Sequence, residues 1–144
     1  MTLTQALSDP ARRLLVVKDG SKLIDAEVAS KRGISGMALK AGYKTIRRLR
    51  PGMIEHALHK LLPQFAPAVD PHYINAKDSG DVKGYFVKHS AEIAESMLAV
   101  TDDIATRAKN KVMLKVYKTL RGQAKGHVEA AMPGLSELIS KHVD

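Results

Sequence analysis

The chain repeats one sequence pattern, and this duplication limits its possible folds more than any other feature. The passage that begins at Tyr43, YKTIRRLRPGMIEHALHKL, aligns without a gap with the passage that begins at Tyr117, YKTLRGQAKGHVEAAMPGL. Upstream, LIDAEVASK (23–31) faces AVTDDIATR (99–107). Each half is too short to bury a sufficient core alone. The sequence therefore predicts a single domain over residues 1–144, built from tandem repeats at about 9–69 and 80–144 that pack about a pseudo-two-fold axis.

Hydrophobic spacing and helix-end residues predict that both repeats are helical. Asp9-Pro10 is typical of an N-cap followed by proline in the first turn, and Pro51-Gly52 separates two helical segments. Asp70-Pro71 indicates a further helix start, and breaks are expected near Asp19-Gly20 and near Thr101. Sustained alternation of apolar and polar residues, which a strand would need, is absent. The predicted fold class is an all-α helical bundle.

Composition excludes several classes of protein. The chain has no cysteine, so disulfides, thiol catalysis and cysteine-ligated metals are excluded. Aromatic residues make up 4% of the chain and tryptophan is absent, so the core should be mostly aliphatic. The longest strongly apolar run, Leu14 to Val17, is far too short to cross a bilayer. The first residues lack an apolar signal core, and a cytoplasmic location is expected.

Positive charge is concentrated in two blocks of the sequence. The net charge is +8, while residues 31–60 carry eight Lys or Arg and one acid, and residues 107–126 carry seven and none. The blocks occupy the same element of each repeat, so the duplication places basic surface twice on one scaffold. We expect anion-binding side chains on two helices. They are Lys40, Lys44, Arg47, Arg48, Lys111, Lys115, Lys118 and Arg121.

Both basic helices are predicted to be amphipathic, with a cationic outer stripe. In the first helix, the residues that fall broadly opposite the stripe are Ile34, Ala38, Ala41, Thr45, Ile46 and Leu49. In the second, they are Val112, Met113, Val116 and Leu120. Such a stripe suits nucleic-acid phosphates, another polyanion, an acidic protein or an anionic membrane surface, and a solvated helix face would have the same composition. The leading hypothesis is a non-catalytic binding or scaffold protein that contacts nucleic-acid backbone, with little sequence information.

Residues 28–52 also resemble the helix-turn-helix of bacterial repressors. Ala29, Gly33 and Ile34 match the small residue, the turn glycine and the following apolar residue of that motif. The recognition helix would start at Ser35, and its exposed reading positions would include Gly36, Met37 and Lys40. Gly36 and Met37 offer no strong hydrogen-bonding group to a base edge. The second copy, IATRAKNKVML, lacks the glycine turn. A DNA-binding regulator is therefore an alternative, and close packing of another helix at the small residues Ala38, Ala41 and Gly42 is the competing interpretation.

Several further residues have both a functional and a structural interpretation. Tyr43 and Tyr117 could stack on a base, but packing at the junction of the halves is favoured. Glu55 and Glu129 could act in proton transfer or metal binding, but a carboxylate near a helix start that pairs with Arg47 or Arg121 is favoured. His56 and His59 share a helix face without a third ligand at fixed spacing, so the sequence predicts no metal site and no cofactor.

No set of residues nominates a reaction, so an enzyme is not predicted. The rival to anion binding is a helical carrier of a small apolar ligand, because methionines adapt to irregular cavities as well as fill cores. The residues that suggest it are Met37, Met53, Met97, Met113 and Met132. A large apolar cavity would favour the carrier, and a continuous basic surface would favour the anion binder. A homo-oligomer that uses one helix face is a further alternative.

As a whole, the chain resembles an actinobacterial family of small two-repeat helical proteins with no assigned function. The resemblance spans nearly the full length and is carried by four segments. They are GISGMALKAGYK (33–44), RPGMIEHALHKLLPQF (50–65), AESMLAVTD (94–102) and GHVEAAMP (126–133). It implies a helical fold, and it argues against an ordinary repressor.

Overall fold

The computed structural model describes residues 1–143, except for the side chains of Ser35, Met113 and Val116. Within residues 1–143 the chain forms eight α-helices and no strand, which confirms the predicted fold class. The helices are α1 (Leu3–Leu7), α2 (Pro10–Ser30), α3 (Gly33–Leu49), α4 (Met53–Ser79), α5 (Val82–Lys88), α6 (Ser90–Thr106), α7 (Lys111–Ala130) and α8 (Met132–His142).

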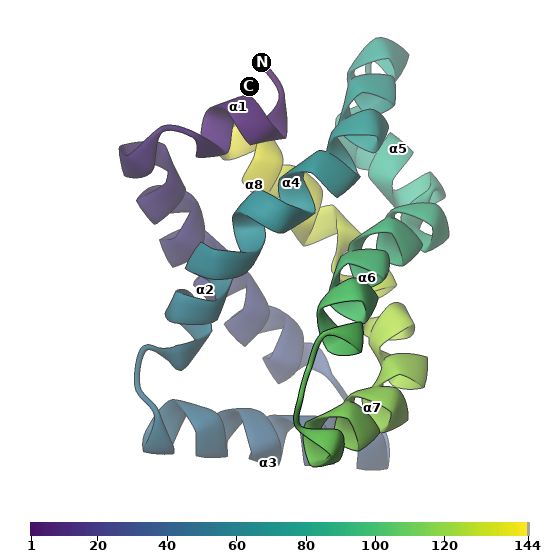
Figure 1. Cartoon of the computed structure of the whole chain (residues 1–144). Coiled ribbons are helices and arrows are strands. Elements are labelled where there is room, and N and C mark those ends of the chain that lie inside the picture. Colours follow the sequence, from purple (N-terminus) through teal and green to yellow (C-terminus); the bar gives the residue numbers. More distant parts are fainter. Residues whose placement is uncertain (144) are drawn as a thin grey trace.

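Helix α4 lies at the centre of the arrangement and contacts α1, α2, α5 and α6 (Figure 1). Helix α8 packs against α2 and α5, and α6 pairs with α7. The two termini lie close together at one end of the molecule, beside α1 (Figure 1). Helix α3 crosses the opposite end, where α7 also begins (Figure 1). The two helices that carry the basic blocks therefore share one end of the molecule.

The core is concentrated away from α3 and α7. Tyr73, Phe86, Ile93 and Met132 are fully buried and come from α4, α5, α6 and α8. None of the hydrophobic side chains described in α3 or α7 is buried. Most of the hydrophobic stabilisation therefore comes from the other helices, although Val128 of α7 packs, partly buried, against this core.

Helix α4 is continuous through Asp70-Pro71, so the predicted helix start at this position is wrong. Its three internal prolines, at positions 63, 67 and 71, recur every four residues and are all exposed. Each proline lacks an N–H, so one carbonyl in the preceding turn receives no hydrogen bond from it. Because the prolines lie on the solvent side, water can bind that carbonyl instead. The carboxylate of Asp70 instead accepts hydrogen bonds from Leu3 N at 2.6 Å and Thr4 Oγ1 at 2.6 Å. Asp70 thus caps α1.

Two other predicted helix breaks are also wrong. Helix α2 continues through Asp19-Gly20. The helical stretch after Val82 breaks at His89, not near Thr101, and His89 stacks on Tyr85 with ring centroids 4.2 Å apart. The predicted separation at Pro51-Gly52 is confirmed, since Gly52 has a φ of 82° and α4 begins at Met53.

The two predicted repeats differ at the equivalent position. Gly52 separates α3 from α4, whereas α7 runs straight through Gly126 to Ala130 before α8 begins. The left-handed Gly52 lies in the turn after α3, whereas Gly126 is helical and exposed. The division into two repeats and their pseudo-symmetric packing stay predictions.

Candidate functional site

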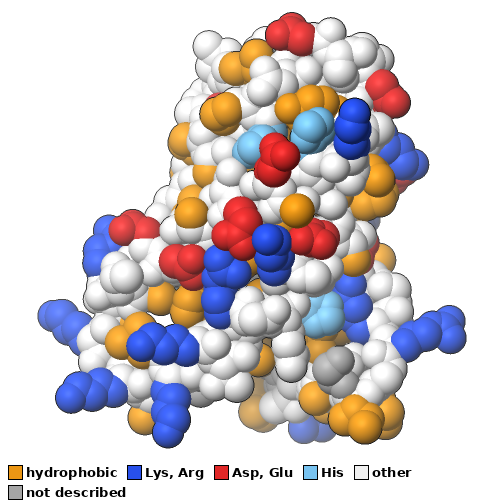
Figure 2. All heavy atoms as spheres, turned by 90° about the vertical axis from the view of Figure 1, so that its right-hand side faces the viewer, with side chains coloured by type: hydrophobic (Ala, Val, Ile, Leu, Met, Phe, Trp, Pro, Cys, Tyr) orange, Lys and Arg blue, Asp and Glu red, His pale blue; other side chains and the backbone are white. Residues whose placement is uncertain are grey.

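The eight predicted anion-binding residues are divided between α3 and α7. Figure 2 shows Lys and Arg side chains projecting from the lower part of the molecule, where both helices lie. The four residues from α3 line one open groove between α2 and α3, with a volume of about 610 Å³. The groove is lined by Asp25, Val28, Ala29, Lys40, Tyr43, Lys44, Arg47 and Arg48. The residues from α7 lie outside this groove.

Arg47 is the centre of a polar network that joins three helices. Its Nη1 donates to Glu55 Oε1 at 2.5 Å, and its Nη2 donates to Asp25 Oδ1 at 2.9 Å and to Ser21 Oγ at 2.6 Å. Ser21 in turn donates to Glu55 at 2.7 Å, and Tyr43 donates its hydroxyl to Asp25. The interpretation of Glu55 as a structural partner of Arg47 is therefore confirmed.

These contacts shift the titration of the groups involved. The hydrogen bonds from Arg47 and Ser21 lower the pKa of Glu55 to about 2. The same ion pair raises the pKa of Arg47 further. Burial and the neighbouring Asp25 raise the pKa of Tyr43. Arg47 is therefore committed to protein carboxylates, which leaves Lys40, Lys44 and Arg48 as the cations that the groove offers to an outside anion.

A similar group of residues holds α7 against α6. Tyr117 donates to Asp102 Oδ1 at 2.5 Å, and Arg121 binds Asp102 at 2.9 Å and Glu95 at 3.3 Å. The hydrogen bonds from Arg121 and Tyr117 lower the pKa of Asp102. Arg121 therefore pairs with α6 and not with Glu129, contrary to expectation. Each tyrosine bonds to the helix that precedes it, so packing at the junction of the halves is not its main role.

Sequence reasoning missed Asp25 and Asp102, the carboxylates that receive these contacts. A signal was present in the sequence, because tyrosine and arginine recur four residues apart at 43 and 47 and again at 117 and 121. Residues four apart share a helix face. Both polar pairs therefore mark the side of the helix that turns toward the protein.

The apolar side of α3 faces outward as a result. Ile34, Met37 and Leu49 are 90%, 70% and 69% exposed. In α7, Val112 and Leu120 are 71% and 55% exposed, while Met113 and Val116 of the predicted apolar side lie outside the described side chains. The expected cationic stripe is thus accompanied by an uncovered apolar face, since the Tyr43–Arg47 edge and not the aliphatic edge packs against α2.

The helix-turn-helix interpretation loses one of its reading positions. Gly36, expected to be exposed, is buried at the corner between α2 and α3. A Cβ atom on Gly36 would lie 2.9 Å from the backbone carbonyl carbon of Lys31. Helix α3 also begins at Gly33, whose φ is 79°, and not at Ser35. The small residue at position 36 therefore serves the tight corner. The close helix packing expected at Ala38, Ala41 and Gly42 is wrong, because all three are exposed and a Cβ on Gly42 would meet nothing within 4 Å.

A second candidate site lies inside the bundle. A partly open cavity of about 380 Å³ runs between α2, α4 and α8, and its walls are almost wholly aliphatic. They include Leu23, Ile24, Leu58, Leu62, Val69, Val128, Leu135 and Ile139. The charged Lys31 and Glu27 in the lining pair with each other at 3.6 Å, and His142 binds Asp19 at 2.8 Å. The cavity therefore offers an apolar ligand little competing polar chemistry.

The methionines that suggested a carrier are not gathered in one place. Met97 and Met132 line the cavity, whereas Met37 and Met53 are exposed on α3 and α4, and the Met113 side chain lies outside the described residues. His56 and His59 are exposed on α4. Across the described part of the chain, no three His, Asp or Glu side chains are grouped as a metal would require, and no helix could span a membrane.

Comparison with known proteins identifies a family without assigning an activity. No curated protein and no solved structure matches the chain. The model of a family of unknown function, DUF6918, matches residues 3–143. The expected family without an assigned function is thereby confirmed, and the actinobacterial origin stays a prediction. The chain therefore belongs to this family of unknown function.

Proposed function

We propose that the protein is a carrier of a small apolar ligand, which it holds in the cavity between α2, α4 and α8. The observation that carries this proposal is the size and lining of that cavity. Protein interiors contain few voids larger than a water molecule. A cavity of about 380 Å³ lies within the range of small-molecule pockets. Cavities with apolar walls accept apolar molecules.

The lining defines the class of ligand. Aliphatic side chains from several helices surround the space, so an aliphatic or aromatic hydrocarbon portion would be favoured by burial alone. The Lys31–Glu27 pair neutralises the charge at one part of the wall. A ligand with a charged group would have to keep that group at the open side of the cavity, because burial of an unpaired charge is costly.

The experiment is titration of the protein with a neutral apolar fluorophore, N-phenyl-1-naphthylamine. Gly20 lines the cavity, and a Cβ there would lie 3.6 Å from Leu58 Cδ1, an ordinary contact. Gly20→Leu should therefore fold and fill part of the space. Gly122→Leu is the matched control, because Gly122 is exposed in a helix with no neighbour within 4 Å.

The wild type and Gly122→Leu should bind one fluorophore, and Gly20→Leu should bind it at least about tenfold more weakly, an order-of-magnitude effect for lost burial of a few methylene groups. Circular dichroism would check that each variant is folded, and Leu62→Phe would replace Gly20→Leu if the latter does not fold. Equal binding by the wild type and the folded cavity-filling variant would contradict a ligand in this cavity.

The second candidate is contact with an anionic partner, and its leading form is nucleic-acid backbone. The basic groove of α3 supports it, with Lys40, Lys44 and Arg48 as phosphate contacts, as do the exposed Lys111, Lys115 and Lys118 of α7. Fluorescence anisotropy of mixed-sequence duplex DNA over a salt series tests it. Binding should weaken steeply with salt and be lost in the Lys44→Glu, Arg48→Glu, Lys115→Glu, Lys118→Glu variant. Absence of binding at low salt would reject it.

A further inference from the structure

We infer that the end of the molecule formed by α3 and the start of α7 docks on the surface of an anionic lipid bilayer. In this arrangement the outward aliphatic side chains of α3 enter the boundary between headgroups and acyl chains, and the lysines and arginines beside them bind lipid phosphates. We call this end the docking surface. It consists of Ile34, Met37, Leu49, Lys44 and Arg48 of α3, together with the exposed Val112, Leu120, Lys111, Lys115 and Lys118 of α7.

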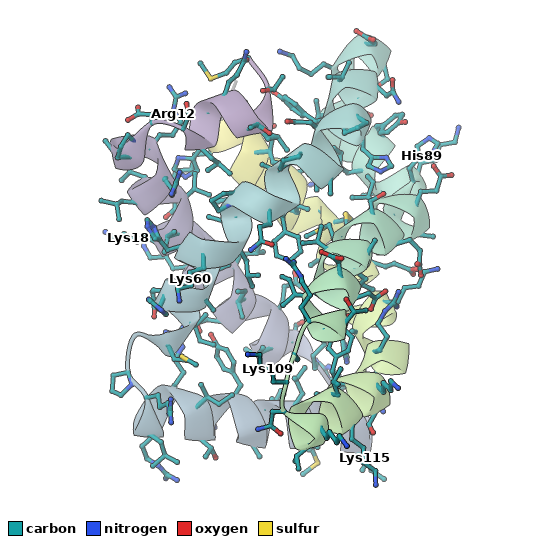
Figure 3. All side chains as sticks on the ribbon, viewed as in Figure 1. Arg12, Lys18, Lys60, His89, Lys109 and Lys115 are labelled. Atoms are coloured by element: carbon teal, nitrogen blue, oxygen red, sulfur yellow. The ribbon has the colours of Figure 1, made fainter. Side chains whose placement is uncertain are left out.

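The first observation is that α3 turns its apolar side away from the protein. Ile34, Met37 and Leu49 lie on the outward side of the helix and are each more than two-thirds exposed. Side chains project from α3 away from the rest of the molecule (Figure 3). A single exposed aliphatic residue is ordinary, but several along one helix mark a binding surface. The inward contacts of Tyr43 and Arg47 with Asp25 fix this orientation.

The second observation is the charge around this apolar face. The chain has no acidic residue between Lys31 and Ile54 and none between Arg107 and Val128. Lys44 and Arg48 are exposed at the edge of the apolar face of α3, and Lys111, Lys115 and Lys118 are exposed on α7. Figure 2 shows basic and hydrophobic side chains together at this end. An amphipathic helix with this composition is suited to the interface of an anionic bilayer.

The charge also decides between possible occupants of the face. A second copy of the chain would bring two strongly basic ends together, which like-charge repulsion disfavours. Nucleic acid would satisfy the lysines but would leave Ile34, Met37 and Leu49 in water. An anionic bilayer satisfies both the cations and the aliphatic side chains, because phosphates and acyl chains lie within a few ångströms of each other at its surface.

The docking surface lies next to the proposed ligand cavity. Val28 and Lys31 at the end of α2, and Leu39 on α3, line the cavity. Docking would thus bring one end of the cavity to the bilayer, the natural reservoir of apolar molecules. This link rests on the proposed function, but the docking itself depends only on the outer faces of α3 and α7.

The first test is co-sedimentation with vesicles of phosphatidylcholine, with and without phosphatidylglycerol. The wild type should sediment with the anionic vesicles only. Ile34→Gln combined with Leu49→Gln, and separately Lys44→Glu combined with Arg48→Glu, should each reduce binding at least about tenfold. The matched controls are Leu14→Gln with Leu15→Gln and Arg12→Glu with Lys18→Glu, which make the same changes on α2 and should bind as the wild type does.

The second test uses the absence of tryptophan from the chain. In Ile34→Trp, the single tryptophan should shift its emission to shorter wavelength on anionic vesicles and be quenched by lipids brominated on the acyl chain. Leu14→Trp should show neither effect. In the absence of vesicles, the glutamine and glutamate variants of the docking surface should bind the fluorophore as the wild type does. A failure of docking and a failure of the cavity proposal are therefore separately visible.

Three results would overturn the inference. One is absence of binding to any vesicle. Another is loss of binding in the charge variants alone, with the glutamine variants unaffected and duplex DNA competing, which would indicate polyanion contact without insertion. The last is a wild-type dimer in analytical ultracentrifugation that becomes monomeric in the Ile34→Gln, Leu49→Gln variant, which would show that the face is covered by a second copy.

Discussion

Arg47 and Glu55 lie on opposite sides of the Pro51-Gly52 turn, and the 2.5 Å contact between Nη1 and Oε1 ties α3 to α4. The contact matters because α3 buries none of its described hydrophobic side chains. Its position depends on the polar network of Arg47 with Glu55, Ser21 and Asp25 and on the backbone at its ends.

Arg47→Met should therefore destabilise the protein by about 1–2 kcal/mol, a value that allows for the partial exposure of the pair. The reason is that Glu55 and Asp25 lose their shared cation. Urea unfolding followed by circular dichroism measures the change. Arg48→Met, an exposed neighbour on the same helix, should change the free energy of unfolding by less than about 0.5 kcal/mol. Equal effects of the two substitutions would show that the network does not hold α3.

The free energy of unfolding should decrease as the pH is lowered, and part of this decrease should depend on Glu55. Its pKa is about 2 in the folded protein and near its ordinary value of 4.5 when the chain is unfolded. Its contribution is thus fully present above about pH 4.5 and is lost as the pH falls toward 2. Urea midpoints measured between these limits should drop less steeply for Glu55→Gln than for wild type. Glu137→Gln, which removes an exposed surface pair with Lys83, should leave the slope unchanged.

Two glycines of α3 should respond in opposite ways to alanine. Gly36→Ala places a Cβ 2.9 Å from the backbone of Lys31, so the corner must shift at a cost of about 1–3 kcal/mol. Gly42→Ala meets nothing within 4 Å and should stabilise the helix by up to about 1 kcal/mol. Thermal unfolding compares them. A Gly36→Ala protein as stable as Gly42→Ala would mean that the corner is not tightly packed.

Removal of the Asp70 carboxylate should release α1. Asp70→Ala leaves Leu3 N and both donors of Thr4 without this acceptor, at a cost of about 1–3 kcal/mol. Hydrogen exchange of the α1 amides should accelerate, while exchange in α6 changes less. Asp78→Ala, an exposed acid on the same helix, is the control. Unchanged protection of α1 in Asp70→Ala would refute the capping role.

Most helix positions were predictable because the signals for them are local. Asp9 before Pro10 and Gly52 after Pro51 act within a few residues, and both predictions are confirmed. Asp70-Pro71 misled because its aspartate caps a helix 66–67 residues away in sequence and its proline lies on an exposed face. A single sequence does not distinguish a carboxylate that caps its own helix from one that caps another.

The candidate sites were predictable only in part. Helical periodicity placed Lys40, Lys44 and Arg48 on one face of α3, where the structure has them together in the groove. Periodicity does not state which face of a helix points outward. That choice was made by Asp25 and Glu55, which bind Tyr43 and Arg47 and turn the aliphatic face to solvent. The cavity depends on contacts among helices distant in sequence, so methionine content did not locate it.

The prolines at positions 63, 67 and 71 also have a consequence for the order of folding. Each removes a hydrogen bond from the helix interior, so a peptide that contains only residues 53–79 would have little helix in water. Helix α4 is nevertheless the element that touches α1, α2, α5 and α6. We therefore expect the centre of the molecule to acquire its helix late in folding, on a surface that its neighbours provide, and we expect α4 not to lead the transition state alone.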